Sequence, residues 1–256
     1  MGRRVDSHPS VDVTYADRLN ALYGALWRAG VTADVVHPSA DLGGYRLVLV
    51  PTLYLVRDAD VEALHRYVEG GGTAAVTYFS GIVDPDDHIR LGGYPGAFRE
   101  LLGVRTEEFF PCARASRSTS TTAAPPTCGP SGCTRRRGGA RVVHRWPLPG
   151  VPALTRRSVG DGAAWYVGTR LDEPATDRLV ARLLAEAGVR PAAPAPSGVE
   201  VVRRRADEQS WLFVINHTDA EVRLPAHGDE LLTGARCAGE LILPAGEVAV
   251  VREDRT

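Results

Sequence analysis

The run from Gly71 to Gly103, GGTAAVTYFSGIVDPDDHIRLGGYPGAFRELLG, decides the fold that we expect. It opens with a strand of the buried type, Thr73 to Tyr78, because small and β-branched residues dominate it. A polar loop follows, and it ends in the turn Gly92 to Gly96. A short helix, Ala97 to Leu102, closes the run. This order of strand, loop and helix is typical of an α/β domain.

The residues before this run alternate between helical and strand patterns. Apolar residues fall on one face of a helix between Thr14 and Ala29, and Gly30 can end it. Ala33 to Val36 and Arg46 to Pro51 are predicted strands. A further helix is expected to begin at a cap on Asp58 or Asp60 and to end at the glycines after Glu69. The rhythm predicts a doubly wound parallel sheet, flavodoxin-like or class I glutamine amidotransferase-like, with helices on both faces.

Two more elements belong to the same predicted domain, which covers 1–190. Residues 153–159 and 163–169 flank Gly160-Asp161-Gly162, a turn signal that predicts a hairpin. Asp172 is expected to cap a helix with Pro174 in its first turn, and the apolar spacing predicts a buried stripe of Leu179, Val180, Leu183 and Leu184. Residues 191–198, PAAPAPSG, are typical of a linker. Short alternating runs in 199–256 then predict a small antiparallel β-sandwich.

The segment 112–146 differs in composition from the rest of the predicted first domain. No acidic residue lies between Glu108 and Asp161, and no Leu, Ile, Phe, Tyr or Trp lies between Cys112 and Arg145. Such a composition cannot supply a core, so we expect a long irregular loop or disorder. A dispensable insertion, a shift of the reading frame and a basic binding loop remain open as explanations.

Composition excludes several classes of function. The net charge of -1 gives no reason to expect nucleic acid or an anionic membrane as a partner. No apolar run reaches the length of a membrane span, and the N-terminal residues have no apolar signal region, so the cytoplasm is the expected location. The histidine spacings match no metal motif, and the C-x4-C pair Cys128 and Cys133 is a weak metal signal because no second pair accompanies it. No glycine-rich phosphate loop follows a first strand, so we expect no cofactor.

Several stretches together resemble the family 42 glycoside hydrolases, the bacterial β-galactosidases of that class. They are the opening run, VTYADRLNALYGALWRAGVTADVVHPSADL from Val13, RLVLVPTLYLV from Arg46, AAWYVGT from Ala163, and the C-terminal LFVINHTDAEVRLP and LPAGEVAVV. The resemblance implies a trimerisation domain followed by a C-terminal β-sandwich domain, and so a homotrimer. The family hydrolyses terminal β-D-galactosides with two glutamates about 5 Å apart. Both lie on a barrel of about 250 residues, for which this sequence shows no room.

A group of polar residues at the carboxyl end of the strand Thr73 to Tyr78 is the candidate site. Ligand sites form at such strand ends in α/β sheets. The residues could contact a neighbouring subunit or line the rim of its sugar pocket, or the aspartates could simply stabilise turns. The candidates are Tyr78, Ser80, Asp84, Asp87 and His88.

Two hypotheses of different classes therefore stand. The first is an oligomerisation and scaffold part of a β-galactosidase without catalytic residues of its own. The second is a freestanding amidotransferase-like or small-molecule-binding domain. Amidotransferase chemistry needs a nucleophilic cysteine on a tight strand-to-helix turn, and the sequence around Ser80 lacks the cysteine and the preceding glycine of that motif.

Overall fold

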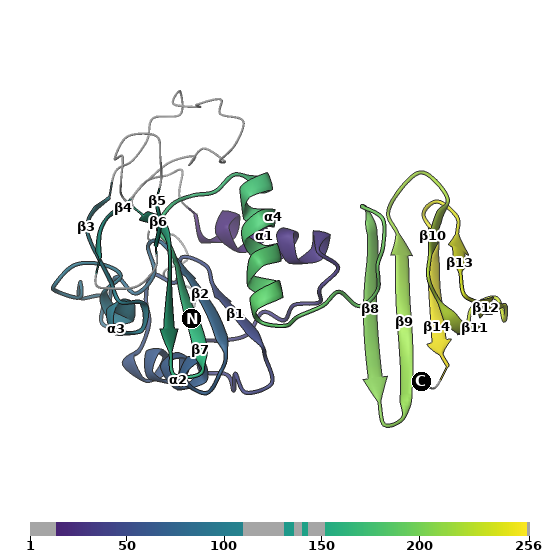
Figure 1. Ribbon diagram of the computed structural model, residues 1–256, viewed down its shortest axis with the longest axis horizontal. Coiled ribbons are helices and arrows are strands. Elements are labelled where there is room, and N and C mark those ends of the chain that lie inside the picture. The colour runs from purple at the N-terminus through teal and green to yellow at the C-terminus, as the bar shows by residue number, and fades with distance from the viewer. Residues whose placement is uncertain (1–13, 110–130, 136–139, 143–151, 255–256) are drawn as a thin grey trace. The chain divides into compact units, whose positions relative to one another are not determined.

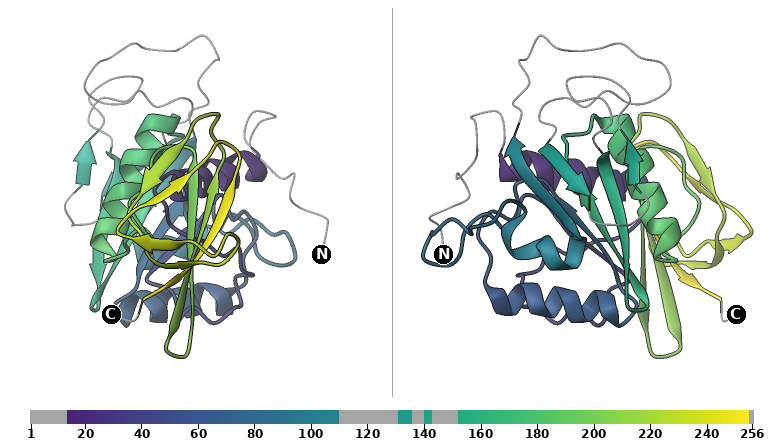
Figure 2. Two further views of the ribbon diagram at one scale, coloured as in Figure 1. Left: turned by 90° about the vertical axis from the view of Figure 1, so that its right-hand side faces the viewer. Right: turned by 60° about the vertical axis from the view of Figure 1, so that its left-hand side comes forward.

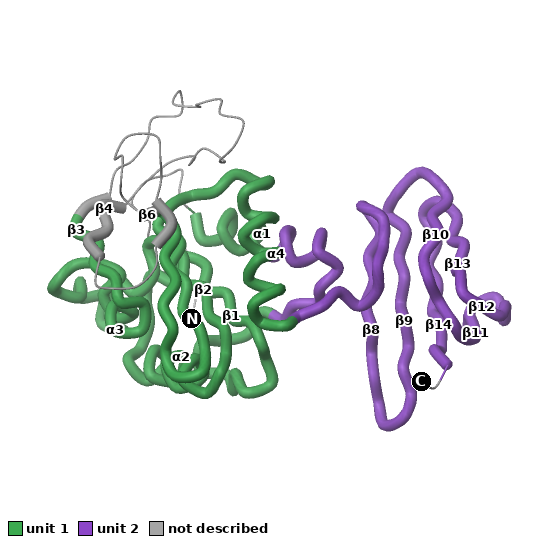
Figure 3. The backbone as a smooth tube through the Cα atoms, viewed as in Figure 1, with its two compact units in different colours: residues 1–22, 35–188 green, residues 23–34, 189–256 purple. Residues whose placement is uncertain are grey.

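The computed structural model describes residues 14–109, 131–135, 140–142 and 152–254 (Figure 1). The chain divides into two compact units (Figure 3). The first contains Met1–Leu22 and Val35–Gly188, and the second contains Tyr23–Asp34 and Val189–Thr256. No helix in the described part of the chain is both long and apolar enough to cross a membrane.

The first unit is built on a five-stranded sheet of order β1-β2-β7-β6-β5. Its strands are β1 (Leu47–Val50), β2 (Thr73–Thr77), β7 (Gly162–Val167), β6 (Pro152–Val159) and β5 (Ala140–Val142). β1, β2 and β7 run parallel, whereas β7, β6 and β5 are joined by antiparallel pairs. The parallel part and the hairpin of the sequence prediction are confirmed, but the sheet as a whole is mixed.

Successive side chains of the strands point to opposite faces of this sheet, and each face packs in its own cluster of buried residues. On one face, Ala74 and Val76 of β2 pack in a cluster with Leu64 and Val68 of α2 (Asp58–Glu69). On the other face, Ala75 packs in a cluster that includes residues of α4 (Glu173–Glu186). The helices therefore cover both faces, as predicted (Figure 1).

Local signals explain where two helices begin and end. The helix α1 (Tyr15–Arg28) ends before Gly30, which takes a φ of 68° that a glycine adopts without strain. At α4 the side chain of Asp172 accepts a hydrogen bond from the Ala175 amide at 2.9 Å, as its predicted role as N-cap requires. The buried stripe of α4 is also confirmed, and consists of Leu179, Val180, Leu183 and Leu184.

Two local predictions for the N-terminal part of the chain are wrong. Arg57, not Asp58 or Asp60, occupies the N-cap of α2, and its side chain makes no capping bond. Asp60 instead pairs with the Arg57 guanidinium at 2.8 Å. Residues 33–36 form no strand, and Val35 and Val36 are exposed, so these residues have no sheet partner that would bury them.

The expectation that 112–146 is irregular throughout is also wrong in two places. β4 (Ser131–Arg135) pairs antiparallel with β3 (Val104–Phe109), and β5 pairs with β6. Backbone hydrogen bonds need no apolar side chain, so composition could not exclude these strands. The remainder of 112–146 lies outside the described residues.

The second unit contains the predicted antiparallel β-structure. One sheet has the order β12-β11-β14-β9-β8, and β10 pairs with β13 in a second. The strands are β8 (Val199–Ala206), β9 (Gln209–Asn216), β10 (Val222–Leu224), β11 (His227–Glu230), β12 (Arg236–Ala238), β13 (Leu241–Leu243) and β14 (Val248–Glu253). A cluster of buried residues from both sheets forms its core. The strands β11 (HGDE) and β12 (RCA) have no alternating apolar run, so the pattern that predicts the other strands does not extend to these two.

Asn216, at the end of β9, matches a glycosylation sequon but is a structural residue. It is 1% exposed, and its Nδ2 donates to the carbonyls of Ala220 at 2.8 Å, Leu243 at 3.2 Å and Pro244 at 2.8 Å. The nitrogen that a glycan would need is therefore already bonded inside the fold.

Glu230, at the end of β11, organises the turn that leads to β12. It is 4% exposed. Its carboxylate accepts hydrogen bonds from the amides of Leu232, Thr233 and Val250 and from the Thr233 hydroxyl. Burial raises its pKa, but these four hydrogen bonds outweigh burial and hold the pKa at about 2.

Replacement of Glu230 by Gln should therefore destabilise the second unit. A carboxylate whose pKa is lowered from 4.5 to about 2 contributes about 3 kcal/mol to the free energy of unfolding. That contribution is complete above pH 4.5 and disappears as the pH falls toward 2. Denaturant unfolding at pH 7 should show a loss of about 2–3 kcal/mol for Glu230→Gln, which shrinks at pH 3. The exposed Glu247→Gln is the control, and equal stability of both variants would contradict this role of Glu230.

Candidate functional site

The candidate site begins where β2 ends. Tyr78 continues the ladder, since its amide donates to the Val167 carbonyl at 2.7 Å. Phe79 then has a φ of 61°, a conformation uncommon for residues other than glycine. The chain turns sharply at this point and buries Ser80 completely. Tyr78 is only 7% exposed, so neither Tyr78 nor Ser80 presents its side chain on the surface.

The Ser80 hydroxyl is used inside the fold. Its Oγ accepts a hydrogen bond from the Leu53 amide at 3.0 Å. Leu53 follows β1, so this bond ties together the segments that leave two neighbouring strands. Ser80 therefore joins the loops at the carboxyl edge of the sheet, and the other candidates lie further along the chain.

The loop after Ser80 folds back on itself as a small hairpin. Val83 bridges Leu55 in parallel and Ile89 in antiparallel orientation. The Arg90 amide donates to the Ile82 carbonyl at 2.9 Å, and the Asp84 amide donates to the His88 carbonyl at 3.0 Å. The loop extends from the body of the first unit in both views of Figure 2. We refer to residues 84–91 as the 84–91 loop.

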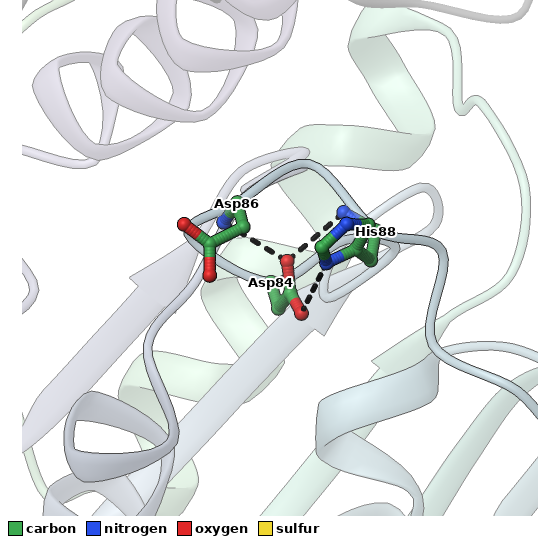
Figure 4. A group of neighbouring side chains, drawn as sticks. All are labelled: Asp84, Asp86 and His88. Atoms are coloured by element: carbon green, nitrogen blue, oxygen red, sulfur yellow. Dashed lines mark hydrogen bonds and ion pairs between the residues drawn. The ribbon is translucent and has the colours of Figure 1, made fainter.

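Asp84 holds the tip of this loop together (Figure 4). Its Oδ1 accepts from the amides of Asp86 and His88, both at 2.9 Å, and its Oδ2 lies 3.5 Å from Nδ1 of His88. The amide of His88 is the main cause that lowers the pKa of the Asp84 carboxyl. Asp84 thus stabilises a turn, one of the roles that its sequence position allowed.

The other two polar candidates lie at the tip as well. Asp87 has a φ of 69°, which the turn requires and which aspartate tolerates better than most residues. The His88 side chain is 79% exposed. Ligand atoms of Asp84, Asp86 and His88 lie within 4.8 Å of one another, but one oxygen of Asp84 already accepts two amide hydrogen bonds. The structure therefore brings Asp84, Asp87 and His88 together and leaves Tyr78 and Ser80 in the interior.

Two arginines, Arg90 and Arg99, connect the base of the loop to the rest of the first unit. Arg90 pairs with Asp58 at 2.6 Å and donates to the Val56 carbonyl at 2.9 Å, and its side chain is 18% exposed. Arg99 donates to the carbonyls of Leu91 at 3.0 Å and Gly96 at 3.1 Å, and also to that of Gly92. Charged donors make stronger hydrogen bonds than neutral ones, so both ends of the loop base are held firmly.

The glycine-rich turn before α3 (Arg99–Leu102) allows the backbone to approach itself closely. The Ala97 amide donates to the Gly81 carbonyl at 3.2 Å. A Cβ on Gly96 would collide with that same carbonyl, and Gly96 has a φ of 37°. The peptide bond between Tyr94 and Pro95 is cis. Glycine at 96 is therefore required by space and by backbone conformation.

The geometry gives no support to an acyl-transfer site at the end of β2. Such a site places a serine or cysteine at the strained residue of the strand-to-helix turn. Here Phe79 occupies the strained position, and Phe79 is 8% exposed within an apolar cluster. The next residue, Ser80, is buried and already hydrogen-bonded. No activated nucleophile is present among these residues.

Sequence reasoning did not select Ile89 and Leu91, the most exposed apolar residues of this loop. Ile89 is 60% exposed and Leu91 is 86% exposed, whereas Arg90 between them points inward. The sequence places an apolar residue on each side of Arg90, so Ile89 and Leu91 point to the face opposite Arg90 if the segment is extended. This alternation is common in strands and does not show which of the two faces is exposed.

The structure is that of an α/β unit with a mixed sheet and a second unit of antiparallel β-structure. Residues 3–190 match the family described as "Beta-galactosidase trimerisation domain", and residues 198–253 match "Beta-galactosidase C-terminal domain". The chain therefore belongs to the glycoside hydrolase family 42 β-galactosidases.

Individual relatives agree with this assignment. A β-galactosidase of Arthrobacter sp. is 49% identical over 98% of this chain and 36% of its own length. A β-galactosidase of Geobacillus sp. (strain Y412MC61) is 35% identical over 97% of this chain and 38% of its own length. The crystal structure of the β-galactosidase from Bacillus circulans sp. alkalophilus superposes with a TM-score of 0.88 at 30% identity, over 97% of this chain and 39% of that chain. The chain thus spans less than two fifths of the length of these relatives.

Removal of the Asp84 carboxylate should loosen the tip of the loop. In Asp84→Ala the amides of Asp86 and His88 lose their acceptor, so their hydrogen exchange should accelerate about tenfold or more. The control Asp86→Ala removes a neighbouring carboxylate that does not hold these amides. NMR gives the exchange rates of these two amides in both variants, and we expect faster exchange only in Asp84→Ala. Unchanged rates in Asp84→Ala would show that the carboxylate does not order the loop.

Proposed function

We propose that this chain provides self-association and scaffolding for a family 42 β-galactosidase. The match of residues 3–190 to a trimerisation domain is the observation that carries the proposal. In this proposal the first unit forms trimers, and the partner of the chain is another copy of itself. In this proposal Asp84, Asp87 and His88 lie at the subunit interface, and Tyr78 and Ser80 support it from the interior.

The hydrolysis of terminal β-D-galactosides belongs, in this proposal, to the part of the family that these residues do not match. The matched regions are the trimerisation and C-terminal domains, and they cover 36–38% of the curated relatives. Retaining glycosidases need two carboxyl groups about 5 Å apart that face the glycosidic bond. We assign no residue of this chain to either catalytic role and no cofactor to the chain.

Three finer features complete the proposal. The parallel strands β1, β2 and β7 with helices on both faces support a flavodoxin-like or class I glutamine amidotransferase-like sheet. The ranges of the two family matches support domains at 1–190 and 199–256, joined by a linker at 191–198. We place the chain in the cytoplasm, a location with which the buried free thiol of Cys237 agrees.

Sedimentation velocity over a range of concentrations tests self-association. The chain of 27.5 kDa should sediment as a trimer at micromolar concentration and dissociate on dilution. Static light scattering on the same samples gives the mass independently of shape. A monomer at every concentration would reject the proposed assembly.

An assay with a chromogenic β-galactoside tests the absence of catalytic residues. The purified chain should give no turnover above buffer, because the catalytic pair of glutamates is assigned to unmatched parts of the relatives. A full-length family member is the positive control. Turnover that follows the protein through a second purification would overturn this part of the proposal.

A further inference from the structure

The 84–91 loop carries apolar side chains that the fold does not bury. Within the described part of the first unit, the exposed large apolar residues are Val35, Val36, Ile89 and Leu91. Leu91, at 86% exposed, is the most exposed of the four. Scattered exposed apolar residues are common on protein surfaces, so exposure alone does not indicate a partner. The support beneath Ile89 and Leu91 distinguishes them from Val35 and Val36.

The structure presents these two side chains on a fixed backbone. Ile89 bridges Val83, and the Arg90 guanidinium between the two residues is anchored to Asp58 and to the Val56 carbonyl. The Leu91 carbonyl accepts from Arg99 at 3.0 Å. Because the loop is already ordered, association would cost little conformational entropy at its backbone, which favours binding.

The surroundings of the pair resemble the rim of a protein interface. Asp84, Asp86, Asp87 and His88 lie on the same loop, and the His88 side chain is 79% exposed. Specific interfaces combine an apolar centre with a polar rim. The loop supplies both within a short segment, so its chemistry fits a protein surface better than it fits a small polar ligand.

We propose that the 84–91 loop, through Ile89 and Leu91, forms part of the contact between copies of this chain. The proposal rests on the proposed self-association and names the surface that performs it. A second copy is the occupant that the observations favour, because the loop falls within the region matched as a trimerisation domain. In a threefold ring each copy presents one surface to a different surface of the next, so Ile89 and Leu91 need not meet their own equivalents.

The test compares two double variants of the full chain. Ile89→Ser/Leu91→Ser removes the apolar pair without adding charge. The control, Leu231→Ser/Leu232→Ser, changes a second pair of exposed residues, which are 46% and 63% exposed and lie in the second unit. Sedimentation velocity of wild type and both variants gives the dissociation constants. Circular dichroism spectra and melting temperatures within experimental error of wild type should show that both variants fold.

The expected result is a dissociation constant at least tenfold weaker for Ile89→Ser/Leu91→Ser and unchanged for the control. If wild type self-associates and both variants do so with equal affinity, the loop is not the contact, although the proposed function stands. If both variants weaken equally, the effect is not specific to the loop and the proposal fails. If wild type is monomeric throughout, the proposed self-association fails and the surface fails with it.

Discussion

The first unit depends on the burial of β2 on both faces. All five residues of this strand are buried, and its alternating side chains enter separate clusters that involve α2 on one side and α4 on the other. The residues of this strand, TAAVT, are small or compact, and close packing at this position means that larger side chains would have to displace the residues around them. β2 lies between β1 and β7 and pairs with both, so its position fixes the register of these strands and the edge of the sheet from which the candidate loop leaves.

A short series of specific contacts connects β2 to the 84–91 loop and holds the backbone of that loop in place. The strained turn at Phe79 places Ser80 beneath the segment that follows β1, and the Ser80 hydroxyl binds the Leu53 amide. The backbone at Gly96 lies close to the Gly81 carbonyl, and Arg90 and Arg99 bind the two ends of the base of the 84–91 loop. The result is a surface loop with an ordered backbone that carries exposed apolar side chains. This combination suits a domain whose matched family is described by its assembly rather than by its chemistry.

The sequence predicted those features that depend on neighbours along the chain. The Asp172 cap, the hairpin around Gly160 and the stripe of α4 all follow from local spacing. Features that depend on distant partners could not be predicted. Ser80 was a candidate ligand residue, but its hydroxyl accepts a hydrogen bond from the distant Leu53 amide. The Glu230 carboxylate likewise accepts from the amide of Val250, which lies twenty residues further along the chain. The pairing of β3 with β4 and the exposure of Leu91 likewise depend on tertiary structure alone.

An experimental structure of the assembled full chain tests the central claim most directly. The account predicts a closed ring in which the 84–91 loop of each copy lies against the first unit of the next, with Ile89 and Leu91 buried between them. It also predicts that the Asp84 turn and the Arg90 anchor keep the geometry described here, since the loop is already ordered in one copy. Copies that meet only through the second unit, or loops that remain open to solvent in the assembly, would contradict the account.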